Sequence, residues 1–316
     1  MAAVSIKNTL PNIILDESAA EYLHILKKSG CQEVFEDHTR VEECPTECNI
    51  LLASAPLAEE FLHAGHSAKW IQSTWAGNAK LIPLLKQADT ILTGVKGVFG
   101  PLIAEYVFAY LLPKVRGTKR SSDAQAENRW DSFEPDTLQG KEFVFIGTGS
   151  IGAHVANVAR AFGMKTVGVS RSGVSLDGFD RMYPTDKLDQ AIQTADFILL
   201  SVPETPASSR LIGKSTLAAV KPGATLINVG RGSTLDTSAV IDALEVGQLS
   251  LVILDVFDTE PLPADSPLWG TPGVILTPHI AAVSYPQIIA EKFLNNLVRY
   301  NLGDELADVI DPLIGY

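Results

Sequence analysis

The sequence predicts an α/β protein of two domains, each built on a parallel sheet that helices cover. The chain has 316 residues, and at about 150 residues per domain this length corresponds to about two domains. A hydrophobic fraction of 46% and a charged fraction of 20% are typical of a folded globular chain. Runs of Val, Ile and Leu alternate with helix-like stretches, which indicates parallel sheets buried on both faces.

The first half of the chain predicts one domain of alternating strands and helices. Strands are expected at residues 11–15, 32–37, 49–55 and 69–74, and helices at 18–30 and 55–65. Residues 286–303 also have helical spacing, and we expect this last helix to return and pack on the first domain. The first domain is therefore predicted to comprise residues 1–98 and 285–316.

Two segments of opposite character connect the halves. Residues 101–120 are too long for a strand and apolar on nearly all sides, which predicts a helix buried in an interface. Residues 121–140 are polar, lack periodicity and include Pro135. We therefore expect a loop there, at the entry to the second domain.

The second half repeats strand and helix more regularly and predicts a second domain at residues 99–284. Its strands are expected at residues 142–147, 165–170, 196–202, 224–230, 249–257 and 272–282. Its helices are expected at residues 150–163, 188–195, 217–223 and 237–248.

The charge of the chain excludes some classes of partner. The net charge is −12, and such a field repels phosphate backbones and anionic lipid head groups. No run of Lys and Arg interrupts it, and no apolar run reaches the 18 or so residues that span a membrane. We expect neither a nucleic-acid nor a membrane partner.

The cysteines and the N-terminal segment predict a cytoplasmic protein. Cys31, Cys44 and Cys48 are an odd number, which suits reduced thiols better than a disulfide framework. Cys44 and Cys48 lack the spacing of a metal site and have no second pair, so no metal is expected. The first residues show no basic segment followed by an apolar one, so no signal peptide is predicted.

A glycine-rich turn follows the strand expected at 142–147. Its sequence is Gly147-Thr148-Gly149-Ser150-Ile151-Gly152, and a helix begins there. The first glycine allows a tight turn, the second lets the backbone approach a pyrophosphate, and the third lets helix and strand pack closely. With a second strand in register, this context predicts a dinucleotide site.

The end of the second strand indicates which dinucleotide binds. A carboxylate about twenty residues after the glycines usually holds the ribose 2′-hydroxyl of NAD, but here the residues are Ser170, Arg171 and Ser172. A 2′-phosphate needs such a guanidinium, so we predict NADP(H), with NAD(H) as the alternative. Arg171 could also be a solvent-exposed residue of a turn.

Three chemically capable residues follow three successive strands of this second domain. Arg231, Glu260 and His279 each lie just past a strand, and ligands of open α/β sheets bind beyond the carboxyl ends of the strands. Alone, each is more often a loop or surface residue. Together they suit reduction of a 2-oxo acid, because Arg binds a carboxylate with a planar fork. A His with a pKa of about 6.5 delivers a proton, and a neighbouring Glu orients it.

The chain resembles the D-isomer-specific 2-hydroxyacid dehydrogenases. The ordered motifs that carry the resemblance are GTGSIG (147–152), VPETPAS (202–208), NVGRGSTLD (228–236), LDVFDTEPLP (254–263) and SPLWGTPGVILTPHIAA (266–282). The stretches KWIQSTWAGNAKL (69–81), GVKGVFGPLIAEYVFAYLL (94–112) and VSRSG (169–173) look most like the glyoxylate/hydroxypyruvate reductase branch.

The resemblance implies a fold and an activity. It implies a Rossmann-type NAD(P)-binding domain and a discontinuous, flavodoxin-like substrate domain, which close on each other. It implies reduction of small 2-oxo acids to 2-hydroxy acids, and a homodimer built around the helix near residues 100–117.

The resemblance also implies roles for individual residues. Arg231 anchors the substrate carboxylate, His279 donates the proton and Glu260 is its partner, while Asp255 faces the nicotinamide amide. The backbone amides around Trp75, Ala76 and Gly77 hold the substrate, with Arg231 and His279. The cofactor-binding residues it implies are Gly147, Gly149, Ser150, Ile151, Gly152, Ser170, Arg171, Ser172, Val202, Pro203, Val229, Gly230, Arg231, Asp255 and His279.

One position departs from the family pattern, and two alternative functions remain to be distinguished from reduction of 2-oxo acids. Asn78 stands where many relatives carry Asp, which changes the expected hydrogen bonding of the substrate loop. A nucleotide-sensing or corepressor-like module without turnover is one alternative, since fold alone does not fix function. Another dehydrogenase of the same family, acting on formate or phosphite, is the other.

Overall fold

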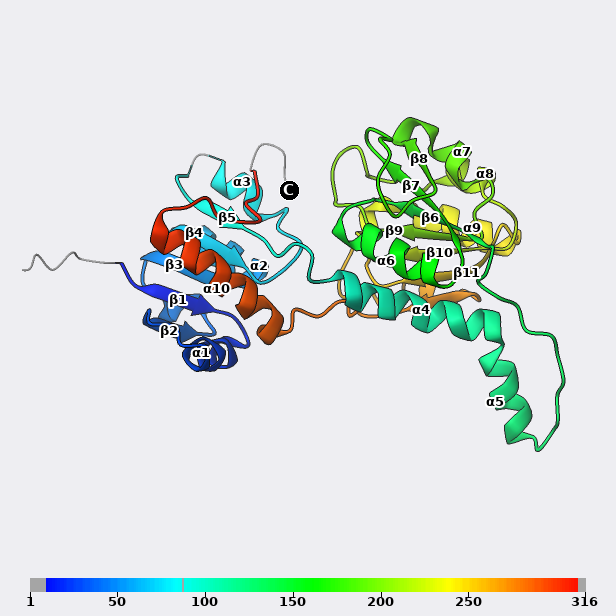
Figure 1. The fold of residues 1–316 in the computed structure, drawn as a ribbon, viewed down its shortest axis with the longest axis horizontal. Helices are drawn as coiled ribbons and strands as arrows, with labels where there is room; N and C mark the ends of the chain where they lie inside the picture. Colours follow the sequence, from blue (N-terminus) through cyan, green and yellow to red (C-terminus); the bar gives the residue numbers. More distant parts are fainter. Residues whose placement is uncertain (1–9, 87, 312–316) are drawn as a thin grey trace, which may run out of the picture. The chain divides into compact units, whose positions relative to one another are not determined.

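The computed structural model describes residues 10–86 and 88–311, and they form two compact units (Figure 1). The five-stranded unit comprises the chain up to Val98 together with the segment from Ser284 onward. The seven-stranded unit comprises Phe99–Val283.

The five-stranded unit contains an entirely parallel sheet with the order β2-β1-β3-β4-β5. This is the strand order 2-1-3-4-5 of flavodoxin-like folds, the kind of fold that the family resemblance implied. Its strands are β1 (Asn12–Leu15), β2 (Phe35–His38), β3 (Glu47–Ala53), β4 (Ser67–Ser73) and β5 (Ile91–Thr93).

Helices cover both faces of this sheet because its buried residues alternate between the two sides. Ile13 and Leu15 of β1 share a core with Phe61 of α2. On the other side, Trp70 of β4 stacks on Phe293 of α10, with ring centroids 5.4 Å apart. The last helix therefore packs on the first unit, as expected. The helices of the unit are α1 (Ala19–Lys28), α2 (Ala55–His63), α3 (Leu81–Leu85) and α10 (Pro286–Leu302).

The seven-stranded unit contains a second parallel sheet, with the order β12-β11-β10-β9-β6-β7-β8. Numbered from β6, this is the Rossmann order 3-2-1-4-5-6 with one added strand, so the predicted fold class is confirmed. The strands are β6 (Glu142–Ile146), β7 (Lys165–Ser170), β8 (Arg181–Pro184), β9 (Phe197–Leu200), β10 (Ala224–Asn228), β11 (Leu249–Leu254) and β12 (Val274–Leu276).

Two helical layers enclose the second sheet. An aliphatic core that includes Val144, Leu226 and Val252 lies against residues of α7, α8 and α9. The long helix α4 packs against α6, and Figure 1 shows both along the same face of the sheet. The helices are α4 (Gly100–Arg116), α6 (Ser150–Ala161), α7 (Leu188–Ile192), α8 (Lys214–Ala219) and α9 (Thr237–Glu245).

The polar segment after α4 is partly helical, so the prediction of a loop over 121–140 was wrong in its first part. Gly117, at φ 63°, ends α4, and a new helix, α5 (Thr118–Ala126), begins at once. Lys119 pairs with Asp123 one turn on, and Arg120 donates two hydrogen bonds to Asp131 beyond the helix. These polar pairs hold a helix that buries only Ala124, which explains the missing apolar period.

Candidate active site

The glycine-rich turn after β6 has the geometry that a dinucleotide pyrophosphate needs. Gly147 has φ 104°, and a Cβ there would lie 2.9 Å from the carbonyl oxygen of Ser201. A Cβ on Gly152 would overlap the carbonyl oxygen of Gly147, so only glycine lets helix and strand approach this closely. A Cβ on Gly149 would meet nothing within 4 Å. The turn is thus packed on its inner side and open on its outer side, where α6 begins with Ser150 and Ile151.

The amino end of α6 is available to an anion. Gly149 is the N-cap residue, and no side chain in the described part of the protein caps the helix. The first N–H groups of a helix carry partial positive charge and point outward along its axis. The turn therefore fits the phosphates of a bound dinucleotide.

The predicted selectivity residues lie at the carboxyl end of β7. The hydroxyl oxygen of Ser170 accepts a hydrogen bond from the N–H of Gly173 at 3.1 Å, and that of Ser172 accepts one from Val174 at 3.4 Å. These bonds shape a tight turn, and Arg171 is exposed upon it.

The predicted segments around Val202 and Val229 lie against each other. A Cβ on Gly230 would lie 2.8 Å from the carbonyl oxygen of Val202, so only a glycine lets these two loops touch. Pro203 continues the first loop and accepts a hydrogen bond from Ser208 at 2.7 Å.

Arg231 is held in place by its own loop. The fully buried Asn228 donates to the carbonyl oxygen of Arg231 at 2.9 Å and accepts from the N–H of Gly230 at 3.0 Å. The guanidinium donates to the carbonyl oxygen of Gly230 at 2.6 Å. Burial lowers the pKa of Arg231, whereas the charges of Glu204 and Glu260 act in the opposite direction. The guanidinium is therefore partly desolvated and is influenced by the charges of two acidic side chains.

His279 and Glu260 form a direct pair. The imidazole Nδ1 of His279 lies 2.8 Å from Oε2 of Glu260, and Oε1 of the same carboxylate accepts the N–H of Phe257 at 2.9 Å. The two side chains stay 46% and 36% exposed, respectively, so a ligand can reach them. The structure therefore joins the His and Glu that the sequence analysis singled out, and the charge of the same Glu acts on Arg231.

The backbone at His279 is strained. Its φ is 55°, in the left-handed region that residues other than glycine rarely adopt. Its N–H donates to the carbonyl oxygens of Asp255 and Thr277, at 2.9 and 3.0 Å. Strain of this kind persists only where surrounding contacts impose it, and it is common at functional sites.

Asp255 supports this loop. Its side chain is 2% exposed and accepts hydrogen bonds from the hydroxyl of Thr277 at 2.6 Å, the N–H of Ile280 at 2.8 Å and the N–H of Ala281 at 2.9 Å. The family resemblance implied a role for Asp255 towards the cofactor, and the sequence analysis missed this supporting role. The motif LTPH contained Thr277 but gave no sign of its contact.

The predicted substrate loop follows β4 in the five-stranded unit. The N–H of Trp75 already donates to the hydroxyl of Ser73 at 3.1 Å, while the amides of Ala76 and Gly77 have no hydrogen-bond partner within 10–86 and 88–311. Asn78 is 6% exposed and donates to the carbonyl oxygen of Trp75 at 3.1 Å. Asn78 therefore holds the loop from its buried side, and its Oδ1 is buried with no hydrogen-bond partner among the residues that the structure describes.

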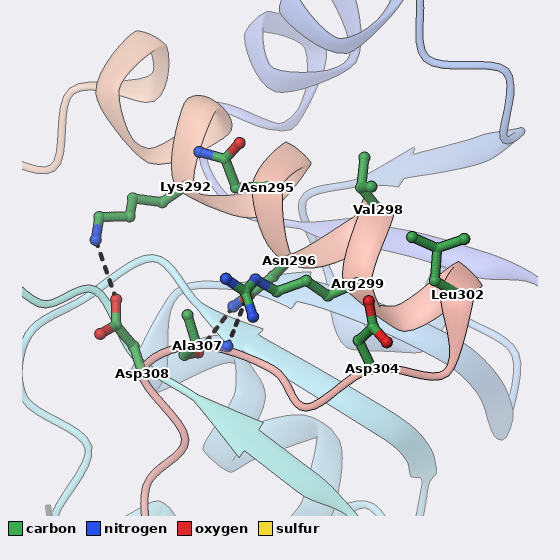
Figure 2. Close-up of a pocket in the computed structure, with 9 residues that line it drawn as sticks. All are labelled: Lys292, Asn295, Asn296, Val298, Arg299, Leu302, Asp304, Ala307 and Asp308. Atoms are coloured by element: carbon green, nitrogen blue, oxygen red, sulfur yellow. Dashed lines mark hydrogen bonds and ion pairs between the residues drawn. The ribbon is translucent and has the colours of Figure 1, made fainter.

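A groove of about 560 Å³ lies elsewhere, along α10 and the segment after it (Figure 2). Lys292 pairs with Asp308 at 3.2 Å, and Asn296 exchanges two hydrogen bonds with the backbone of Ala307, at 3.0 and 2.8 Å. None of the predicted site residues lines this groove. Its polar groups bind one another, so we do not assign the active site to it.

Two features are absent from the described part of the chain. No cluster of three or more His, Cys, Asp or Glu side chains in it could hold a metal ion. None of its helices combines the length and apolar character needed to cross a membrane.

Known proteins resemble this chain in sequence and in fold. A model of the NAD-binding domain of D-isomer specific 2-hydroxyacid dehydrogenases matches residues 108–281. Glyoxylate/hydroxypyruvate reductase A of Serratia proteamaculans is 32% identical over 235 residues, which are 74% of this chain and 73% of that protein.

Two solved structures match nearly the whole chain. A D-isomer specific 2-hydroxyacid dehydrogenase family protein from Aeromonas salmonicida is 37% identical, with a TM-score of 0.90, over 96% of this chain and 100% of its own. A D-isomer specific 2-hydroxyacid dehydrogenase from Xanthobacter autotrophicus, in complex with NADPH and MES, is 25% identical. The match has a TM-score of 0.86 and covers 98% of this chain and 100% of that one.

A two-domain oxidoreductase with a Rossmann-type NAD(P) domain is the class that this fold and these matches define. The chain belongs to the D-isomer specific 2-hydroxyacid dehydrogenase family, and the resemblance predicted from its motifs is confirmed.

Proposed function

We propose that this protein is an NADPH-preferring reductase of small 2-oxo acids, with glyoxylate and hydroxypyruvate as the first candidates. The observation that carries the proposal is the His279–Glu260 pair, 2.8 Å apart, in a unit that also holds the half-buried Arg231. The name of the Serratia relative supports the same substrates.

Arg231 anchors the substrate. Its guanidinium can donate two parallel hydrogen bonds to a carboxylate. Because burial removes water from the cation, an anionic substrate binds it more strongly than it would in bulk water. A 2-oxo acid bound in this way also has its ketone within reach of the same cation.

His279 supplies the proton. Glu260 engages Nδ1, so Nε2 is left to donate to the carbonyl oxygen of the substrate. The carboxylate of Glu260 stabilises the imidazolium, the form of His279 that reduction consumes. In the reverse direction the same nitrogen accepts the proton of a 2-hydroxy acid.

The seven-stranded unit holds the cofactor. When bound, the nicotinamide cofactor supplies the hydride that reduces the ketone. The turn from Gly147 to Gly152 binds its phosphates, and Ser170, Arg171 and Ser172 bind the 2′-phosphate that distinguishes NADP(H) from NAD(H). Further contacts come from the loops that follow β9, β10, β11 and β12, through Val202, Pro203, Val229, Gly230, Arg231, Asp255 and His279.

The five-stranded unit serves as the substrate domain. The free amides of Ala76 and Gly77 suit the carboxylate of the substrate, whereas the amide of Trp75 is engaged by Ser73. Trp75 is 43% exposed, and its ring would restrict the site to small 2-oxo acids.

The protein forms a homodimer through α4 and the segment that follows it. Trp130, just after α5, is 97% exposed, and Figure 1 shows α5 extending away from the sheet of its own unit. Such an aromatic side chain is a typical anchor of an interface. Analytical ultracentrifugation should give a dimer that Trp130→Ala weakens; a monomeric wild type would contradict this assignment.

Titration of NADPH and NADH oxidation against a panel of 2-oxo acids tests the proposal. We expect turnover of glyoxylate and hydroxypyruvate, with a higher kcat/KM for NADPH. Tight NADPH binding without turnover of any 2-oxo acid would contradict the proposal and favour a nucleotide sensor. Reduction of NADP⁺ by formate or phosphite alone would favour another dehydrogenase of the family.

A further inference from the structure

We propose that Tyr106 of α4 is a positioning residue for the reaction, which holds the strained loop of His279 through Thr277 and Asp255. The inference rests on the proposed function in that it takes His279 as the proton donor. It adds a residue that lies far from the other site residues in the sequence.

The His279 loop needs outside support. A residue other than glycine in the left-handed region costs about 1 kcal/mol or more, and His279 has φ 55°. The N–H groups of the next two residues, Ile280 and Ala281, point at the carboxylate of Asp255. The loop therefore keeps its shape only while this carboxylate stays in place.

The hydroxyl of Thr277 is the third donor to that carboxylate, at 2.6 Å. A hydroxyl has one proton to donate. Since Thr277 gives it to Asp255, the contact of 2.7 Å between the hydroxyls of Thr277 and Tyr106 must have Tyr106 as its donor. The result is a chain of donors directed from Tyr106 through Thr277 to Asp255.

The phenol of Tyr106 is suited to this role. Burial raises its pKa above the usual value, which favours the protonated phenol that donates this hydrogen bond. Its ring meets Tyr110 edge to face, with centroids 5.0 Å apart, and the next residue, Val107, is fully buried. The hydroxyl is thus fixed by a well-packed part of α4.

Replacement of one hydroxyl tests the chain of donors. Tyr106→Phe removes only the donor, and Tyr110→Phe is the matched control, because it removes a hydroxyl from the adjoining ring of the same helix. Thr277→Val removes the middle of the chain, and Thr277→Ser restores its hydroxyl. All four variants are compared with wild type in the full-length protein.

Hydrogen–deuterium exchange gives a readout that does not depend on turnover. In Tyr106→Phe and Thr277→Val we expect the peptide over 277–283 to exchange about threefold to tenfold faster. Tyr106→Phe removes the hydrogen bond that holds the hydroxyl of Thr277, and Thr277→Val removes a donor to the charged carboxylate of Asp255. A peptide from β10 should exchange as in wild type, and so should 277–283 in Tyr110→Phe and Thr277→Ser.

Kinetics give the second readout. Tyr106→Phe should lower kcat about threefold to tenfold while KM for the 2-oxo acid and for NADPH changes by less than about twofold. Equal exchange in Tyr106→Phe and wild type overturns the proposal, as does faster exchange with an unchanged kcat. A wild type that turns over no 2-oxo acid refutes the proposed function instead, and the exchange data still decide whether Tyr106 holds the loop.

Discussion

The carboxyl edges of the two parallel sheets carry different kinds of polar residue. At the edge of the five-stranded sheet, Asp16 is 8% exposed and accepts hydrogen bonds from the N–H of Ser18 at 2.9 Å and the hydroxyl of Thr74 at 3.0 Å. At the edge of the seven-stranded sheet, Glu260 and His279 remain more than one third exposed.

The exposure of a carboxylate indicates its role: buried carboxylates hold loops, whereas an exposed carboxylate can act on a ligand. Asp16 and Asp255 are both buried, and protein groups from neighbouring loops occupy their oxygens. Glu260 uses one oxygen for its own loop and presents the other to an exposed imidazole. Substitution of the exposed or ligand-facing groups of the seven-stranded unit should therefore change the chemical step or ligand binding, while substitution of the buried Asp16 should change stability.

His279→Ala should have the largest effect. We expect kcat with glyoxylate to fall about 10²–10⁴-fold with little change in KM, because the proton donor is lost. The matched control is His63→Ala, which removes a His that also faces a Glu, Glu59, at 3.9 Å on the surface of α2. A wild-type value of kcat in His279→Ala would contradict the assignment of His279 as the proton donor.

Arg231→Ala should raise KM and lower kcat together, with a loss of about 100-fold in kcat/KM, since the carboxylate anchor is gone. Arg231→Lys keeps the charge without the planar fork, so it should recover only part of the loss. Steady-state kinetics over a range of 2-oxo acid concentrations measures both. Full recovery in the lysine variant would show that charge alone anchors the substrate.

Arg171→Asp should shift the cofactor preference towards NADH by about tenfold or more in the ratio of kcat/KM values, because a carboxylate repels the 2′-phosphate. Arg160→Asp, an equal change of charge at the exposed end of α6, is the control. The two ratios come from parallel titrations with NADPH and NADH. An unchanged ratio in Arg171→Asp would leave the arginine without a role in selectivity.

Asp16→Asn should have the smallest effect, and that effect should depend on pH. Burial raises the pKa of Asp16 in the folded protein, so its contribution to stability is full below the unfolded pKa of about 4. That contribution is lost as the pH rises through the raised value. The Tm of the variant relative to wild type should therefore increase by about 2 °C between pH 4 and pH 7. A difference in Tm that is constant with pH would contradict this assignment.

The periodicity of the sequence predicted most strands and helices, and the glycine-rich turn and the Arg, Glu and His residues followed from their places after strands. The prediction missed α3, β5, α5 and β8, and the last two were missed for physical reasons. The helix α5 depends on side-chain pairs such as Arg120 with Asp131, not on an apolar face. The edge strand β8 (Arg181–Pro184) has no aliphatic run that a pattern could detect.

The contacts that shape the site were beyond prediction for a different reason. Tyr106 and Thr277 are 171 residues apart in the chain, and neither stands in a pattern that suggests a hydrogen bond. Asp255 stood in a matched motif, but only the fold shows that its carboxylate holds the backbone after His279. Sequence patterns locate groups that react, whereas the groups that position them are found through packing.

A crystal structure of the protein with NADP⁺ and oxamate, an unreactive analogue of a 2-oxo acid, tests the central claim most directly. We expect the guanidinium of Arg231 to bind the carboxylate of oxamate and Nε2 of His279 to lie within hydrogen-bond distance of its carbonyl oxygen, with Glu260 still bound to Nδ1. Oxamate bound away from Arg231, or an imidazole turned away from both oxamate and Glu260, would contradict it.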